Sequence, residues 1–123
     1  MAAAKVARRA DRRIYQLQAD ILKALANPVR LEILHVLGGR ELPFDTLVRS
    51  VQVSKTNLSQ HLAVLRRSRI VKARREGVNT YYRLTHPEVE TACEAVGQIL
   101  ARHLVEMGRQ ARELLPQARV GVG

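Results

Sequence analysis

The chain has 123 residues and is short of several features on which common protein classes depend. Its single cysteine excludes an intrachain disulfide and a four-cysteine metal fold. No run of about 18 apolar residues occurs, so we expect no membrane span. Residues 1–27 carry charges every few positions and lack the apolar stretch of a signal peptide. We therefore expect a cytoplasmic protein.

Aromatic and acidic residues are also scarce. Only Tyr15, Phe44, Tyr81 and Tyr82 carry Phe, Tyr or Trp rings. Modules that bind RNA or single strands usually stack several exposed rings on bases, so this class is disfavoured. Eleven Asp and Glu stand against twenty-one Lys and Arg, and the net charge of +10 favours a polyanionic partner.

The positive charge is concentrated in one part of the chain. Residues 54–83 contain eight Lys and Arg and a single acid, Glu76, so this block has a balance of +7. Residues 84–123 contain four basic and five acidic groups. A solvated surface is the simpler explanation for scattered arginines, but one dense block favours a binding surface.

Apolar periodicity predicts five helices, over roughly residues 11–26, 28–37, 43–51, 55–68 and 86–115. Asn27, Ser54 and Thr85 are the expected N-caps, with Glu88 completing a capping box at Thr85. The second helix is so apolar that we expect most of it, Leu31 included, to be buried. Gly38-Gly39 supplies the stop after it.

Between the last two helices the period changes from nearly four to two. Residues 71–74 alternate, residues 80–84 are rich in β-formers, and the turn sequence Gly77-Val78-Asn79 lies between them. This pattern predicts a two-stranded hairpin with an arginine-rich tip. Two helices joined by a short turn and followed by such a hairpin make a winged helix-turn-helix. We predict this mainly α domain over residues 11–115, a flexible basic arm over 1–10 and a flexible tail over 116–123.

The fourth helix and the hairpin carry the side chains expected to contact double-stranded DNA. One helix fits the major groove, where amide and hydroxyl groups read base edges, while arginines contact the backbone. The predicted DNA-binding residues are Ser54, Lys55, Thr56, Asn57, Ser59, Gln60, His61, Arg66, Arg74, Arg75 and Asn79.

Residues 24–34 (ALANPVRLEIL), 59–66 (SQHLAVLR) and 81–84 (YYRL) resemble the ArsR/SmtB family of bacterial repressors. The resemblance implies a homodimer paired through its first and last helices. It also implies binding to an inverted repeat and repression of a promoter until an effector releases the protein. The apolar residues expected at the dimer interface are Ile14, Leu17, Ile21, Val96, Leu100 and Leu104.

The resemblance also indicates where relatives bind metals. Some place thiols at the start of the third helix, where residues 41–45 (ELPFD) have none. Others use ligand pairs on the last helix, where this chain has His86 and Glu88 but then Ile99 and Arg102, which do not ligate cations. We therefore expect no metal cofactor at these positions. A metal-responsive repressor that uses His86 and Glu88 with His103 and Glu106 is the alternative.

Cys93 lies beside the apolar stripe of the last helix. A small buried side chain is one interpretation and a redox or thiol-reactive effector site is the other. No nucleophile–base pair, P-loop or dinucleotide fingerprint occurs, so we expect no enzyme. A constitutive regulator without a ligand, an architectural or RNA-binding basic module, and a protein-interaction adaptor are the other classes left open.

Overall fold

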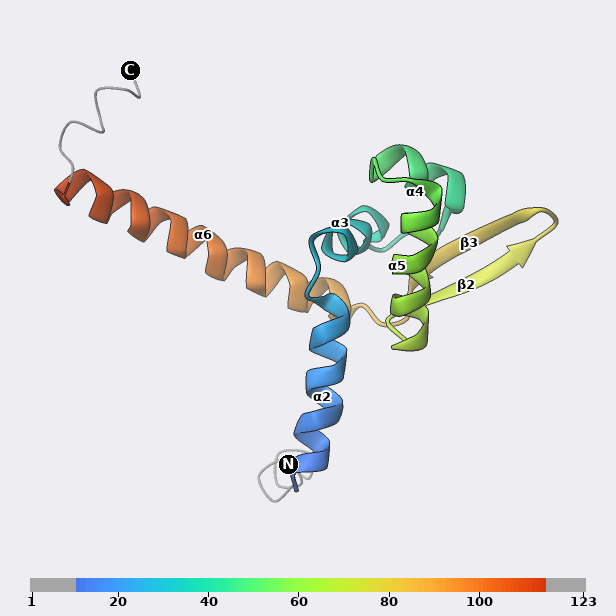
Figure 1. Cartoon of the computed structure of the whole chain (residues 1–123), viewed down its shortest axis with the longest axis horizontal. Helices are drawn as coiled ribbons and strands as arrows, with labels where there is room; N and C mark the ends of the chain where they lie inside the picture. Colours follow the sequence, from blue (N-terminus) through green and yellow to red (C-terminus); the bar gives the residue numbers. More distant parts are fainter. Residues whose placement is uncertain (1–10, 115–123) are drawn as a thin grey trace. The chain divides into compact units, whose positions relative to one another are not determined.

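The computed structural model describes residues 11–114, so the predicted arm (1–10) and tail (116–123) lie outside the described residues. Its elements are α2 (Arg12–Leu25), α3 (Pro28–Leu37), β1 (Leu42–Pro43), α4 (Phe44–Ser50), α5 (Lys55–Arg67), β2 (Val71–Glu76), β3 (Asn79–Leu84) and α6 (Glu88–Leu114) (Figure 1). The predicted winged helix-turn-helix is confirmed. The chain divides into two compact units between Glu90 and Thr91, inside α6. The single domain predicted over residues 11–115 includes parts of both units, and its extent stays a prediction.

Three helices begin where the sequence predicts, because the preceding side chain caps each of them. Oxygens of Asp11, Asn27 and Ser54 accept hydrogen bonds of 2.9, 2.9 and 3.0 Å from backbone N–H groups two or three residues further on. These N–H groups have no partner inside their helices. Pro28 takes the first position of α3, where its missing N–H costs nothing.

Gly38 ends α3 because of its backbone conformation. Its φ of +52° is one that other residues rarely adopt, whereas glycine adopts it without a Cβ clash. The predicted glycine stop is therefore confirmed.

A core forms where α3, α4 and α5 meet the sheet. Its fully buried side chains are Ile33, Leu34, Leu37, Leu47, Val51, Leu58, Leu62, Leu65 and Val71. The expectation that Leu31 is buried is wrong, since it is 40% exposed. Leu31 lies beside Leu34 on α3 but nearly opposite Ile33, so it sits at the edge of the buried side of the helix.

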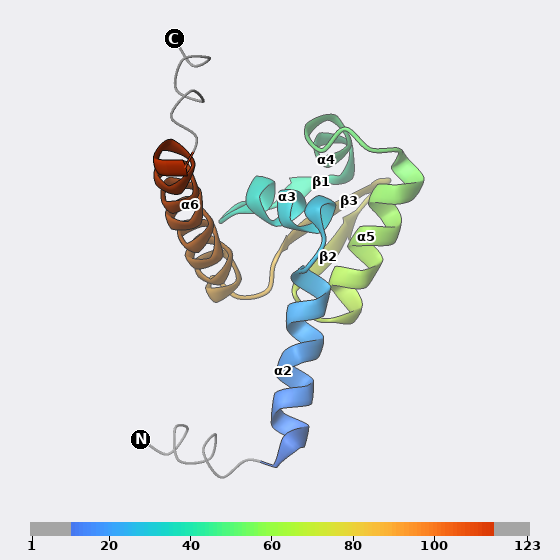
Figure 2. The same cartoon turned by 60° about the vertical axis from the view of Figure 1, so that its left-hand side comes forward.

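The hairpin belongs to a three-stranded antiparallel sheet of order β1-β3-β2, which Figure 2 shows beside α3. We call β2 and β3 the wing. The sequence predicted only these two strands. β1 pairs Leu42 with Tyr82 and Pro43 with Tyr81, and two residues are too few to show the alternation that reveals a strand.

The end of α5 has a backbone conformation that the sequence did not indicate. Arg69 has a φ of +59°, and its N–H donates to the Arg66 carbonyl at 3.0 Å. The Ile70 N–H donates to the Leu65 carbonyl at 2.9 Å, and both of these side chains are buried. This is a Schellman motif with arginine at the position where glycine is usual.

The capping box predicted at Thr85 is wrong. The Thr85 hydroxyl instead donates to backbone carbonyls, with Arg69 O at 2.7 Å and Ile70 O at 3.0 Å. It thereby ties the end of β3 to the turn that follows α5. The last helix begins at Glu88, about one half-turn later than predicted.

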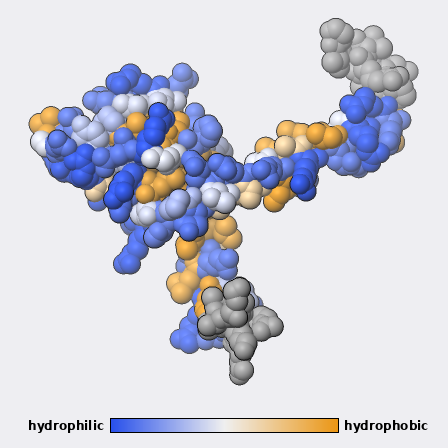
Figure 3. Space-filling model, turned by 180° about the vertical axis from the view of Figure 1, so that it is seen from behind, coloured by the Kyte–Doolittle hydropathy of each residue, from blue (hydrophilic) through white to orange (hydrophobic). Residues whose placement is uncertain are grey.

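The second unit contributes residues 91–114 of α6 to the described chain. None of these residues is buried. Its large apolar side chains are more than half exposed: Val96, Ile99, Leu100, Leu104, Val105, Met107 and Leu114. Figure 3 shows such hydrophobic residues along α6. Among residues 11–114, no helix has the length and apolar character needed to cross a membrane.

Candidate nucleic-acid interface

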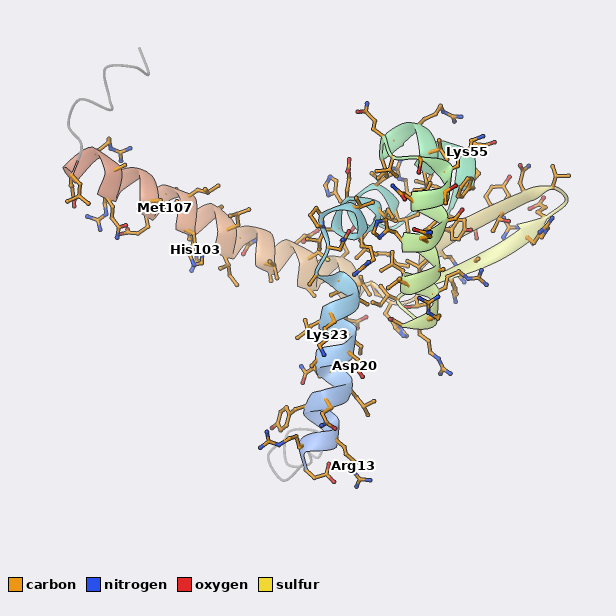
Figure 4. The ribbon with its side chains drawn as sticks, viewed as in Figure 1. Arg13, Asp20, Lys23, Lys55, His103 and Met107 are labelled. Atoms are coloured by element: carbon orange, nitrogen blue, oxygen red, sulfur yellow. The ribbon has the colours of Figure 1, made fainter. Side chains whose placement is uncertain are left out.

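Helix α5 has one buried side and one polar, exposed side. Leu58, Leu62 and Leu65 are at most 1% exposed, as predicted. Most of the predicted DNA-binding residues at this helix are exposed: Ser54, Lys55, Thr56, Asn57, Ser59, Gln60 and Arg66. Figure 4 shows Lys55 at the first turn. The helix is thus anchored by leucines and presents hydrogen-bonding groups outward.

Thr56 and Gln60 lie on the side of α5 opposite its leucines, because a step of four residues returns to the same side of a helix. Both carry donor and acceptor groups of the kind that read base edges. Arg67 lies on this side too and is exposed, but the sequence prediction missed it. Its spacing of seven from Gln60 is the signal that identifies it.

Ser54 has a local structural task. Its hydroxyl oxygen accepts the Asn57 N–H, so its first contribution is to begin α5. Ser59 and Asn79 line a common cavity of about 280 Å³ between α5 and the wing, together with Asp45. The structure therefore brings these two predicted residues together, beside a carboxylate that disfavours phosphate there.

Arg74, predicted to contact DNA, forms ion pairs with acidic residues of the same chain. Its guanidinium donates to Glu41 at 3.2 Å and 2.7 Å and also to Glu76. It also lies 4.7 Å from the ring centroid of Tyr81. Hydrogen bonding to Arg74 holds the pKa of the Glu41 carboxyl below its usual range, and the charge of Arg83 contributes further.

Arg75 is the less constrained arginine of the wing. Its side chain is exposed, and its Nε donates a long hydrogen bond of 3.4 Å to the carbonyl of Gly77. No acid pairs with it in the part of the chain that the structure describes. Arg75 is therefore better placed than Arg74 to meet a phosphate.

Arg66 lies at the far end of α5 from the capped first turn. It lines a cavity of about 470 Å³ with Arg69, Lys72 and His86, and no acid lines this cavity. Arg69 and Lys72 were not predicted as site residues, although the charge block includes both. This end of the helix therefore carries a cationic patch, separate from the hydrogen-bonding side chains of Thr56 and Gln60.

His61 is half-buried on α5 and contacts another helix. Its Nδ1 lies 3.2 Å from Nη1 of Arg30 in α3. Arg30 belongs to the segment that carries the family resemblance, but the sequence did not predict this contact. The role of His61 in DNA binding stays a prediction.

The effector candidates are placed as follows. Cys93 is half-buried, and burial raises the pKa of its thiol. His103 projects from the middle of α6 (Figure 4). The nearby Glu106 carboxylate accepts from Arg109 and from Gln110. Over residues 11–114, no group of three or more His, Cys, Asp or Glu side chains is arranged to hold a metal ion.

The apolar residues predicted for the dimer interface are exposed in the single chain. On α2, Ile14, Leu17 and Ile21 are 39%, 65% and 48% exposed. On α6, Val96, Leu100 and Leu104 are each more than half exposed. Stripes of this kind usually mark surfaces that pack against another molecule.

Comparison with known proteins identifies the fold and the family. The model of a family described as a helix-turn-helix domain matches residues 25–74. An uncharacterized HTH-type transcriptional regulator of Mycobacterium tuberculosis, Rv0081, is 38% identical over 74% of this chain and 81% of its own length. The transcriptional activator HlyU of Vibrio cholerae is 39% identical over 64% of this chain and 73% of its own.

Solved structures agree. The crystal structure of Rv0081 covers 76% of this chain and 95% of its own with a TM-score of 0.70 and 37% identity. The homodimeric winged helix-turn-helix domain of a possible ArsR-family regulator from Mycobacterium bovis covers 77% and 90%, with a TM-score of 0.68 and 32% identity. The chain belongs to the ArsR/SmtB family of winged helix-turn-helix transcriptional regulators.

Proposed function

We propose that this chain binds a specific inverted repeat in double-stranded DNA as a homodimer. The observation that carries the proposal is the first half of α5, where exposed amide, hydroxyl and ammonium groups lie above buried leucines. Thr56, Gln60 and Arg67 would enter the major groove, and Arg75 on the wing would contact the backbone.

The homodimer is supported by uncovered apolar side chains on two helices. A monomer would leave Leu17 and Leu104 in water at 65% and 56% exposure. The relative from M. bovis is described as homodimeric. A two-fold axis would present two copies of α5 to major grooves about 34–36 Å apart, and so requires an inverted repeat.

Repression is the action we propose. A dimer that fills two major grooves excludes other proteins from the same DNA. The relative HlyU is named an activator, so the likeness alone does not set the direction of control. Because the family is one of transcription regulators and not an enzyme class, we propose no catalytic role and no resident cofactor.

An effector other than a metal at the family's usual positions is proposed to release the DNA. Ile99 and Arg102 stand where ligands would be needed, and Arg102 repels cations. Cys93 is the first candidate, although burial raises the pKa of its thiol and so slows its reaction with oxidants. The alternative is zinc at His86 and Glu88 with His103 and Glu106.

The test of DNA binding compares the protein's own upstream DNA with random duplex of equal length, using fluorescence anisotropy. We expect the upstream DNA to be preferred by at least about 1000-fold, with two chains bound per inverted repeat. Equal affinity for both duplexes would instead indicate an architectural module, a scaffold for protein interactions or, if RNA binds more tightly, an RNA-binding protein.

The test of the effector repeats this measurement after treatment with peroxide, persulfide or zinc. Oxidative release in wild type but not in Cys93→Ser would assign the thiol as the sensor. Identical responses of the two proteins would show that Cys93 only packs. Release by zinc in wild type but not in His103→Ala would establish the metal alternative.

A further inference from the structure

Arg30 in α3 contacts two other helices through one guanidinium. Its Nε donates to the Ala24 carbonyl at 2.6 Å, and its Nη2 donates to the Lys23 carbonyl at 3.3 Å. Both carbonyls belong to the last turn of α2, where cationic donors stabilise a helix end. The third group, Nη1, lies 3.2 Å from Nδ1 of His61 on α5.

This contact determines which nitrogen of His61 carries hydrogen. A guanidinium only donates, so Nδ1 must accept. A neutral imidazole that accepts at Nδ1 carries its hydrogen on Nε2. Nε2 has no hydrogen-bond partner among residues 11–114. The ring is only partly buried, and because Nδ1 accepts from Arg30, its other nitrogen is a donor and not an acceptor.

We propose that His61 reads one base as a hydrogen-bond donor only, and that Arg30 is the positioning residue that fixes its tautomer. The proposal rests on the DNA binding proposed above. In the major groove, guanine offers acceptors at O6 and N7, adenine offers one at N7 and thymine offers one at O4. Cytosine offers an amino donor instead. His61 is therefore expected to discriminate against cytosine at the position it contacts.

The same side chain connects this reading group to the helix with the apolar stripe. Arg30 binds the last turn of α2, and Ile21 of the stripe lies only one turn earlier. A displacement of α2 would therefore move the guanidinium that holds His61.

The first experiment needs no DNA. Nitrogen-15 NMR of the imidazoles, in buffer alkaline enough to keep histidine neutral, reports the tautomer, and His61→Asn identifies the His61 signals. We expect the Nε2–H tautomer in wild type and a mixture of tautomers in Arg30→Met. Arg40→Met is the matched control, because Arg40 donates to the Val36 carbonyl at the end of α3 and makes no hydrogen bond to α5 among residues 11–114. A mixture in wild type, or no change in Arg30→Met, would overturn the role of Arg30.

The second experiment selects preferred duplexes from a randomised pool. Wild type should disfavour cytosine at one position of each half-site. His61→Asn keeps an acceptor for Arg30 but loses the outer donor, so the fold should persist while affinity for the selected duplex falls roughly 10-fold or more. Its affinity for random duplex should not change, and cytosine should become tolerated.

His61→Gln is the matched variant. Its longer amide can present either its nitrogen or its oxygen outward, so the base preference should broaden with little loss of affinity. Discrimination against cytosine that persists in His61→Asn would overturn the base-reading proposal alone. A wild type that prefers no duplex would overturn the proposed DNA reading itself, and the NMR result would still report on Arg30 separately.

Discussion

The guanidinium of Arg74 and the carboxylate of Glu41 form a two-point ion pair between residues 33 apart in the sequence. Nε lies 3.2 Å from Oε2, and Nη2 lies 2.7 Å from Oε1. Since Arg74 also donates to Glu76, its guanidinium is hydrogen-bonded to two carboxylates. Counted along the sequence, Arg74 belongs to the cationic block. In the fold its charge is compensated, and it joins the wing to the segment before β1.

This pairing predicts that the two wing arginines contribute unequally to DNA binding. Arg75→Ala should weaken binding to every duplex and reduce the salt slope of the binding constant by about one, because it removes a free phosphate contact. Arg74→Ala should reduce the slope by clearly less. The measurement is anisotropy over a range of salt concentrations, with Arg109→Ala as the control for loss of a paired arginine. Equal slope changes for Arg74 and Arg75 would contradict the argument.

The same pair predicts a pH dependence of stability. Arg74 lowers the pKa of Glu41 in the folded protein, so the pair stabilises the fold above the pKa that glutamate has in the unfolded chain. That contribution is lost as the pH falls through the lower, folded pKa. Glu41→Gln should therefore be less stable than wild type near neutral pH, and the difference should vanish once the pH lies below the lowered, folded pKa of Glu41. Urea unfolding at several pH values measures it, and a difference independent of pH would contradict the assignment.

The elements that could be predicted from sequence are those fixed by nearby residues. Asn27 and Pro28 begin α3 and Gly38 ends it, and each acts on backbone within a few positions. Ser54 and the leucine spacing of α5 are equally local. These signals place the candidate reading helix and its exposed side. For the same reason the predicted residues from Lys55 to Gln60 are exposed as expected.

What could not be predicted depends on residues that only the fold brings together. Arg30 and His61 are 31 positions apart, and Glu41 and Arg74 are 33 apart. Strand β1 exists only because β3 lies beside it. Thr85 shows how a local pattern can mislead, because its capping sequence is satisfied by two carbonyls from the turn after α5.

Base reading by α5 predicts a change confined to one position of the operator. Gln60→Ala should cost about 1–3 kcal/mol on the preferred duplex and leave affinity for random duplex unchanged. Competition with duplexes mutated at single positions locates the effect. Gln16→Ala, on the exposed side of α2, is the control and should bind as wild type. Equal losses of affinity for specific and random DNA would show that Gln60 does not contact a base edge.

Dimerisation through α6 predicts that a charge on its apolar stripe separates the chains. Leu100→Glu would bury an unpaired carboxylate in the interface, at a cost of several kcal/mol. Sedimentation should show monomer or unfolded chain, with circular dichroism distinguishing the two. Gln98→Glu adds the same charge on the opposite side of the helix and should remain dimeric. A folded, dimeric Leu100→Glu variant would place the interface elsewhere.

The left-handed backbone at Arg69 predicts a stabilising substitution. Glycine adopts a φ near the observed +59° without a Cβ clash, so Arg69→Gly should raise the free energy of unfolding by about 0.5–1 kcal/mol relative to Arg69→Ala. Both variants lose the same charge, so the comparison isolates the backbone from electrostatics. Urea midpoints measure the difference. The two Schellman hydrogen bonds, from Arg69 N to Arg66 O and from Ile70 N to Leu65 O, should persist in both variants. A glycine variant no more stable than the alanine variant would show that the turn after α5 relaxes away from the left-handed conformation when the arginine is removed.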